Sequence, residues 1–277
     1  METKELSIVI VTFKSEAKIF NCLDSIQNNI EVIIIENSSN KNFKQAIEKN
    51  YTNVKCILTG KNIGYAAANN MGLKNVQTKY ALVLNPDTIL NKDAINNFLN
   101  TASKLENFSL IGPANDQGNI KNLENSNLIE VDNLKGFAIF FCMSKFNKIF
   151  FDENFFLYFE EIDLCKKVKK NNGKIYLDKN ITIKHEGASS VDKTNSLEIE
   201  KNRNWHWMWS TFYFHKKYKG FFTALAIIFP KLISSFFKTF FYLLIFHKEK
   251  RDIYFCRLSG ILNSVFGKKS WYRPSLD

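Results

Sequence analysis

Short apolar runs alternate with segments of helical periodicity along the first half of the chain. The apolar runs, rich in β-branched residues, are predicted strands at 6–11, 32–39, 54–58 and 80–84. Helix-like segments lie between them, at 19–26, 41–50 and 62–76. Strands that are apolar along their whole length and alternate with helices are typical of a mainly parallel sheet covered on both faces. The pattern therefore predicts an α/β fold.

Polar residues follow three of these predicted strands. They are Thr12-Phe13-Lys14, Glu36-Asn37-Ser38 and Asn85-Pro86-Asp87. Because ligands gather at the carboxyl ends of parallel strands, we expect these groups side by side at one edge. Pro86 cannot donate to a strand ladder, so it ends the strand and leaves Asp87 at that edge. The alternative is that Asp87 only caps a helix near 92–104.

In the second half of the chain, the pattern predicts a strand at 135–143, a helix at 160–171 and an apolar strand just before His185. From about residue 196 the chain has helical periodicity and many aromatic residues and lysines. We therefore predict two domains, an α/β domain at 1–195 and a helical region at 196–277.

Three carboxylates open the predicted helix at 160–171. Glu160 and Asp163 share one face, and Glu161 points elsewhere. Acidic residues in a first helical turn are favoured by the helix dipole, which explains the cluster without any chemistry. The preceding string FFLYF would hold these carboxylates against apolar walls. Desolvation there would raise a carboxylate pKa and favour a general base.

One of the four histidines, His185, follows the apolar strand ITIK. Such a residue is more often structural than a ligand. Beside an aspartate from another strand end, it could complete an oxygen-rich divalent-metal site with a substrate diphosphate.

Charge and cysteine content narrow the classes of partner. The formal net charge is +11, which suits nucleic acid, anionic lipid or a phosphorylated substrate. The five cysteines are scattered without a CxxC pair, and the N-terminus METKELSIVIV lacks the layout of a signal peptide. Both features indicate a reducing cytosol. We predict no nucleic-acid partner, because no nucleic-acid module is recognised and the basic residues lie beside apolar helices.

Together these segments resemble the family-2 glycosyltransferases of the GT-A fold, especially the rhamnosyltransferase-like branch. The resemblance spans roughly residues 5–217. Its strings, in order, are IVIVTFKSE, IIENSS, NIGYAAANNMG, LNPDT, FDENFFLYFEEIDLC and HEGASS. It implies a GT-A domain with a mainly parallel sheet flanked by helices, and an inverting transfer from a nucleotide-diphosphosugar to a hydroxyl acceptor.

The resemblance also assigns residues. Donor-binding positions would be Thr12, Phe13, Glu36, Asn37, Ser38, Asn62, Gly64, Asn69, Asn70, Asn85 and Pro86. Asp87 would bind Mg²⁺ or Mn²⁺, with His185 as a further ligand. Glu161 stands at the usual position of the base, with Glu160 and Asp163 as the next candidates. The family more often has Glu-Asp at 160–161 and Asp at 36, so this chain departs from it at both places.

Residues 221–246 are the most apolar stretch of the chain. A polar stripe runs along the predicted helix through Lys231, Ser234, Ser235, Lys238 and Tyr242. A narrow stripe of this kind is typical of a helix lying in a membrane interface, and HKEKR at 247–251 adds charge suited to anionic lipid. Pro230 is expected to break or kink the helix. The alternative is a buried or dimer-forming amphipathic helix, which leaves a homo-oligomer open.

The leading hypothesis is a metal-dependent glycosyltransferase, peripheral on the cytoplasmic face of the membrane. Its acceptor would be a glycan, foreseen as a lipid-linked intermediate of bacterial surface polysaccharide. The alternative is a non-catalytic protein that binds sugar nucleotides or membranes on the same scaffold.

Overall fold

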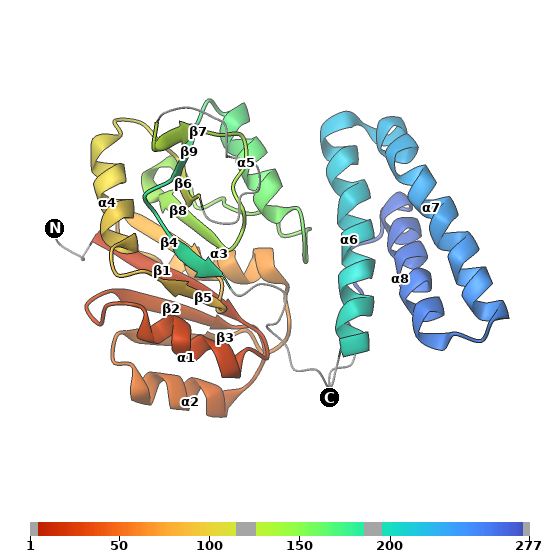
Figure 1. The fold of residues 1–277 in the computed structure, drawn as a ribbon, viewed down its shortest axis with the longest axis horizontal. Coiled ribbons are helices and arrows are strands. Elements are labelled where there is room, and N and C mark those ends of the chain that lie inside the picture. The colour runs from red at the N-terminus through yellow and green to blue at the C-terminus, as the bar shows by residue number, and fades with distance from the viewer. Residues whose placement is uncertain (1–4, 115–125, 186–195, 274–277) are drawn as a thin grey trace. The chain divides into compact units, whose positions relative to one another are not determined.

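The computed structural model describes residues 5–114, 126–185 and 196–273, which form two compact units (Figure 1). The first unit comprises residues 1–152 and 160–190, and the second comprises residues 153–159 and 191–277. The string GASS and Glu186, which follow His185, lie outside the described residues.

The first unit alternates strands and helices. Its strands are β1 (Leu6–Thr12), β2 (Glu31–Glu36), β3 (Val54–Leu58), β4 (Tyr80–Leu84), β5 (Thr88–Leu90), β6 (Leu110–Pro113), β7 (Leu128–Glu130), β8 (Ala138–Cys142), β9 (Ile175–Asp178) and β10 (Ile183–His185). Its helices are α1 (Glu16–Asp24), α2 (Lys41–Asn50), α3 (Tyr65–Asn75), α4 (Ala94–Lys104) and α5 (Glu160–Lys170), with a short 3₁₀ turn at Met143–Lys145.

The strands form one large sheet in the order β3-β2-β1-β4-β8-β6-β9-β7, and β10 pairs with β5 in a separate ribbon. The neighbours from β3 to β4 are parallel, as the continuous apolar runs predict. Strand β8 is antiparallel to both β4 and β6, so the sheet becomes mixed beyond β4. The predicted α/β architecture is confirmed.

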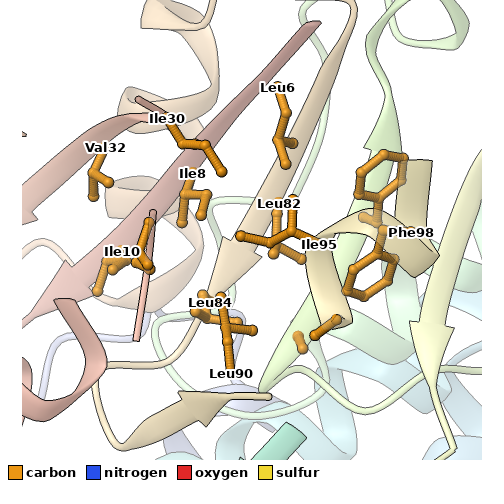
Figure 2. Packing of buried hydrophobic residues seen from close by; sticks show 14 of the residues in the cluster. Leu6, Ile8, Ile10, Ile30, Val32, Leu82, Leu84, Leu90, Ile95 and Phe98 are labelled. Carbon is orange, nitrogen blue, oxygen red and sulfur yellow. The ribbon is translucent and has the colours of Figure 1, made fainter. Parts of the chain in front are cut away.

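Helices cover both faces of the sheet. Alternate residues of β1 point to opposite faces, so Ile8 packs in one core and Val9 in another. The first core receives side chains from α1, α2 and α4, and the second receives them from α3 and α5. Figure 2 shows part of the first core, with labelled side chains Leu6, Ile8, Ile10, Ile30, Val32, Leu82, Leu84, Leu90, Ile95 and Phe98.

The register of the parallel strands brings the three polar strand ends together. Thr12 is paired with Glu36 across β1 and β2, and Ile10 is paired with Leu84 across β1 and β4. The residues that follow these strands therefore emerge at the same edge of the sheet, as predicted.

The described part of the second unit contains three helices, α6 (Ser196–Lys219), α7 (Phe221–Leu244) and α8 (Lys248–Val265). Met208 and Phe212 of α6 form its core with Ile228 of α7 and Ile261 of α8. Helices α6 and α8 approach closely at Gly260, where an added Cβ would lie 2.3 Å from the carbonyl oxygen of Trp205. Of the break or kink expected at Pro230, the break does not occur, because α7 continues through this residue.

Candidate functional site

A buried carboxylate lies where β1 and β2 end. Glu36 is 2% exposed, and its two oxygens accept hydrogen bonds from the hydroxyls of Thr12 and Ser38, each at 2.5 Å. Burial raises the pKa of Glu36, and the two hydroxyl donors oppose that shift. Phe13 follows β1 with a half-buried side chain. This edge therefore offers a carboxyl group held in one position by its neighbours.

Two asparagines shape the loop that enters α3. The side chain of Asn37 donates to Oδ1 of Asn62 (3.0 Å) and accepts from the backbone N–H of Ile63 (2.9 Å). Oδ1 of Asn62 also accepts the N–H of Gly64 (3.0 Å). Gly64 precedes the first turn of α3 at φ +91°, a conformation that favours glycine. The loop thus presents the N-terminus of α3, where backbone N–H groups suit an anion.

Within α3, the adjacent residues Asn69 and Asn70 have different surroundings. Both polar atoms of the Asn70 amide bond the backbone of Phe151, each at 2.9 Å, so this side chain braces a loop rather than lining an open surface. Asn69 donates to the carbonyl of Tyr65 (3.0 Å), and its buried Oδ1 has no hydrogen-bond partner among the described residues.

Asp87 meets His185 at the same edge of the sheet. The β5–β10 ribbon pairs His185 with Thr88, and His185 Nε2 lies 3.4 Å from Asp87 Oδ1. Burial alone would raise the pKa of Asp87, but the hydrogen bond and charge of His185 bring it below its ordinary value. Helix α4 has Asp93 at its N-cap position, so the alternative that Asp87 caps this helix is wrong.

These two side chains are the candidate metal ligands that the sequence proposed. A carboxylate oxygen and an imidazole nitrogen form a donor set that suits Mn²⁺, and Mg²⁺ sites also use few protein ligands together with substrate phosphates. No group of three or more His, Cys, Asp or Glu side chains suited to a metal occurs among the described residues. The pair therefore fits an ion that is also held by the phosphates of a substrate.

The segment Gly136–Phe137 links the parts of the site, and the sequence prediction missed this role. The Phe137 ring stacks on the His185 imidazole, with centroids 4.8 Å apart and planes 10° apart. The carbonyl of Phe137 accepts the N–H of Asn85 (2.9 Å). A Cβ placed on Gly136 would lie 3.6 Å from Cβ of Glu161, so Glu161 packs against this glycine.

Tyr65 joins the same segment from α3. Its hydroxyl donates to the carbonyl of Gly136 (2.8 Å) and lies 3.2 Å from Oδ1 of Asn85. Burial and the charges of Glu160 and Glu161 raise the pKa of this phenol, so it stays a donor at neutral pH. Tyr65 lies within the string NIGYAAANN, but nothing in that string indicates its partners.

The three carboxylates of α5 differ in their environment. Glu160 is 5% exposed, and its Oε2 has no hydrogen-bond partner in the described part of the chain. Burial raises the pKa of Glu160 well above its usual value, and the charge of Glu161 adds to this shift. Burial also raises the pKa of Glu161, although backbone N–H groups oppose the shift. Asp163 is fully buried, with Lys167 Nζ 3.9 Å away.

Comparison with known proteins assigns the family. The family model described as "Glycosyl transferase family 2" matches residues 7–165, which include the Asp87 edge and Glu160–Asp163. The chain belongs to glycosyl transferase family 2.

A curated relative of this family 2 chain is the low-salt glycan biosynthesis hexosyltransferase Agl10 of Haloferax volcanii. It is 31% identical over 195 residues, which cover 61% of this chain and 62% of Agl10. An uncharacterized glycosyltransferase of Rickettsia prowazekii, RP339, is 29% identical over 38% of the chain and 34% of its own length. The chain therefore spans less than two thirds of each of these curated relatives.

Solved structures share the fold at low sequence identity. Mannosyltransferase PcManGT of Pyrobaculum calidifontis, in complex with GDP-Man and Mn²⁺, aligns with a TM-score of 0.58 at 9% identity, over 96% of this chain and 88% of its own. S. aureus TarS 1–349 in complex with UDP aligns with a TM-score of 0.56 at 14% identity, over 98% and 94%. The predicted GT-A fold is confirmed.

The helical unit of this family 2 chain carries a broad apolar surface on α7. Exposed side chains on this helix include Phe229, Ile233, Phe236, Phe237, Phe240, Phe241 and Leu244. By length and composition α7 could cross a membrane, and 17% of its most apolar 18-residue stretch is buried. A single helix of this kind is weak evidence for a membrane-spanning segment.

The polar stripe of α7 contacts α8. Ser235 is 2% exposed, and the ammonium of Lys238 lies 4.9 Å from the centre of the Tyr254 ring. The Tyr242 ring stacks on that of Tyr254, with centroids 5.5 Å apart. Ser235 is therefore withdrawn from the polar stripe by burial, whereas Lys238 is exposed beside Tyr254 and Tyr242 is half-buried against it.

Proposed function

We propose that the protein is an inverting glycosyltransferase that moves a sugar from a nucleotide-diphosphosugar to a hydroxyl of a glycan acceptor. One observation carries this proposal. The short segment Gly136–Phe137 touches both the Asp87–His185 pair, through the stacked imidazole, and the candidate base Glu161. Groups suited to a departing diphosphate and to an attacking hydroxyl therefore adjoin one short piece of backbone.

The donor would bind along the edge formed by β1, β2 and the N-terminus of α3. Glu36 offers a carboxyl group fixed by Thr12 and Ser38, and the loop at Asn62–Gly64 leads into the N-terminus of α3, whose first-turn N–H groups suit an anion. Asn85 and Pro86 follow β4 at the adjacent strand end. The structures of TarS with UDP and of PcManGT with GDP-Man support a nucleotide at this edge, because both share the fold.

Asp87 and His185 would hold Mg²⁺ or Mn²⁺ together with the donor diphosphate. A bound divalent ion stabilises the negative charge that accumulates on the nucleoside diphosphate as it leaves. The described pair supplies one oxygen and one nitrogen, and the lowered pKa of Asp87 keeps its carboxylate ionised for this role.

Glu161 would accept the proton of the acceptor hydroxyl. An inverting transfer needs one base on the side opposite the leaving group, and a carboxylate with a raised pKa is a better base than an ordinary one. Glu161 is only partly exposed, and its pKa is raised by burial. Glu160 and Asp163 are more deeply buried, which favours Glu161 among the three.

The acceptor would be lipid-linked, in bacterial surface polysaccharide assembly, with the helical unit on the cytoplasmic leaflet. The exposed Phe and Leu side chains of α7 would enter the acyl boundary. Lys248, Lys250 and Arg251, which follow the end of α7, would contact anionic headgroups. The transferred sugar is expected to be a hexosyl or deoxyhexosyl group. The name of Agl10, a hexosyltransferase, supports a hexosyl group.

A screen of sugar nucleotides by thermal unfolding, with and without Mn²⁺, tests the proposal. A ligand that binds the native state raises the melting temperature, and at a concentration of about 100 Kd it contributes about 2.7 kcal/mol. We expect one class of nucleotide-diphosphosugar to stabilise the protein, and only with the metal. Sugar transfer or slow hydrolysis of that donor would then establish catalysis. Binding without turnover would leave a non-catalytic sugar-nucleotide binder.

A further inference from the structure

Most glycines of this chain are explained by their backbone conformation or by close packing. One group has φ between +71° and +91°, a conformation that favours glycine: Gly60, Gly64, Gly220 and Gly267. In a second group an added Cβ would lie only 2.3–2.6 Å from another atom: Gly72, Gly112, Gly173 and Gly260. Among the residues that the structure describes, Gly136 alone belongs to neither group.

Gly136 has both the room and the backbone for a methyl group. Its φ lies outside the left-handed region. A Cβ built on it would meet its three nearest atoms at 3.6, 3.7 and 3.9 Å, which is ordinary van der Waals contact. Where the native backbone accepts alanine, glycine is the less stable choice, because it loses more conformational entropy on folding. The fold alone therefore does not explain this glycine.

A need for flexibility does not explain it either, because the segment around Gly136 is held in place. The N–H of Leu134 donates to Sγ of Cys165 on α5 (3.4 Å). The carbonyl of Gly136 itself accepts the hydroxyl of Tyr65 (2.8 Å). These bonds fix the segment on α5 and on α3, so Gly136 is not placed as a hinge.

The space that the missing side chain leaves open lies beside the candidate base. All three atoms nearest to the built Cβ belong to Glu161, and they are its Cβ, Cγ and carboxyl carbon Cδ. Both Gly136 and Glu161 are half-buried. A side chain at position 136 would therefore lie along Glu161 and occupy the space next to its carboxyl group.

We propose that Gly136 keeps this space open for the sugar ring that carries the acceptor hydroxyl, an inference that rests on the proposed glycosyl transfer. In that transfer the hydroxyl oxygen bonds to the anomeric carbon of the donor, its proton passes to Glu161, and the bond from the anomeric carbon to the diphosphate oxygen breaks. A hydroxyl on a ring brings its carbon neighbours to the base, so it needs more room than water does. Gly136 is thus a specificity-determining residue for the acceptor.

Thermal unfolding of the full chain tests whether the fold requires Gly136. Gly136→Ala should raise the melting temperature by about 1–4 °C, since alanine restricts the unfolded chain and meets no clash in the folded one. Gly60→Ala is the matched control, because a Cβ there also has free space but the φ of +78° disfavours alanine. Gly60→Ala should therefore lower the melting temperature.

Carbodiimide coupling of glucosamine tests the space itself. The reaction joins a carboxyl group to the amine of the sugar, so it labels Glu161 only if a sugar ring reaches that carboxyl group. Peptide mass spectrometry measures the labelling rate of Glu161 against that of the exposed Glu106 in the same sample. We expect wild-type Glu161 to be labelled, and Gly136→Val to slow this labelling by about tenfold or more through a steric clash. Gly136→Ala should be intermediate, and Gly60→Ala should match the wild type.

Equal labelling of Glu161 in the wild type and in Gly136→Val would overturn the proposal. So would a wild type that is labelled at Glu106 and not at Glu161, because no sugar ring would then fit beside the base. A lower melting temperature in Gly136→Ala would show that the fold requires the glycine, and would also overturn it. If Gly136→Val does not fold, Gly136→Ala and Gly136→Ser are judged by the same peptide.

The labelling needs neither donor nor acceptor, so this proposal and the proposed function can fail separately. A protein that no sugar nucleotide stabilises in the thermal screen would refute the proposed function. The labelling of Gly136→Val would still decide whether position 136 admits a sugar ring to Glu161.

Discussion

The imidazole Nε2 of His185 lies 3.4 Å from Oδ1 of Asp87, although the two residues are 98 positions apart in the chain. The antiparallel β5–β10 ribbon creates this contact, because it pairs His185 with Thr88. The contact turns two separate strand ends into one potential ligand pair.

Asp87→Asn should abolish metal-dependent donor binding and leave the fold intact. The substitution removes the negative charge while it keeps the shape of the side chain. The melting temperature without ligand should therefore change little, and the additional stabilisation by sugar nucleotide with Mn²⁺ should disappear. Donor-dependent stabilisation that survives in this variant, or in excess chelator, would refute the role of Asp87.

Glu161→Gln should lower kcat by about 10²–10⁴-fold, the usual contribution of a positioned base. The donor affinity, measured by titration, should stay close to that of the wild type. Asp163→Asn is the matched comparison, since Asp163 is fully buried in the same helical turn. Normal turnover in Glu161→Gln together with an inactive Asp163→Asn would reverse the assignment.

Glu160→Gln should stabilise the protein, and more so at higher pH. Burial raises the pKa of Glu160 above its unfolded value, so the folded state favours the neutral carboxyl. Wild-type stability is then reduced as pH rises from the unfolded pKa toward the folded one. The melting temperatures of both proteins should be measured from about pH 4, near the ordinary pKa of a carboxyl group, to about pH 8. The melting temperature of the variant should exceed that of the wild type by an increasing margin as the pH rises. If the two curves of melting temperature against pH run parallel, Glu160 does not have a raised pKa in the folded state.

Tyr65→Phe should lower the rate of catalysis by disturbing the placement of Gly136 and Asn85, and should leave the affinity for the donor nearly unchanged. The variant keeps the ring, which packs edge to face on Phe151 with centroids 6.3 Å apart, and loses the hydroxyl that bridges Gly136 and Asn85. Loss of a buried hydrogen bond costs about 1–3 kcal/mol. We expect a lower kcat with little change in donor KM, and Tyr65→Leu should be worse in both. If Tyr65→Phe has the kinetics of the wild type, the Tyr65 hydroxyl plays no part in catalysis.

Phe237→Gln with Phe241→Gln should release the protein from anionic vesicles. Both side chains are more than half exposed on α7, and burying a large apolar side chain is worth about 1.5–3 kcal/mol. Flotation with anionic and neutral vesicles measures the effect, and the wild type should prefer the anionic ones.

Lys231→Glu with Lys238→Glu provides the contrasting variant. Lys238 packs on Tyr254, and burial together with the charge of Arg257 lowers the pKa of Lys231, so this change should reduce stability in addition to any loss of lipid binding. If the protein resists alkaline extraction from membranes, α7 spans the membrane. A soluble protein without vesicle binding would indicate a dimer or a buried partner.

The sequence determined the α/β architecture and the edge that carries the site. Continuous apolar runs specify buried parallel strands, and Pro86 ends one of them wherever the chain folds. The local pattern also placed the start of α5 at Glu160, since acidic residues favour a first helical turn. These features depend on residues close together in the chain, which is why a pattern reveals them.

The tertiary structure alone decided which side chains meet. The bonds of Asn70 to Phe151, the stacking of Phe137 on His185 and the stacking of Tyr242 on Tyr254 join distant segments, and no local periodicity encodes them. The same holds for the string FFLYF, whose aromatic rings Phe155, Phe156 and Tyr158 pack on side chains of α6, and for the left-handed backbone at Tyr158 and Phe159. Backbone strain of this kind is set by packing from the whole fold, so it is absent from the sequence pattern.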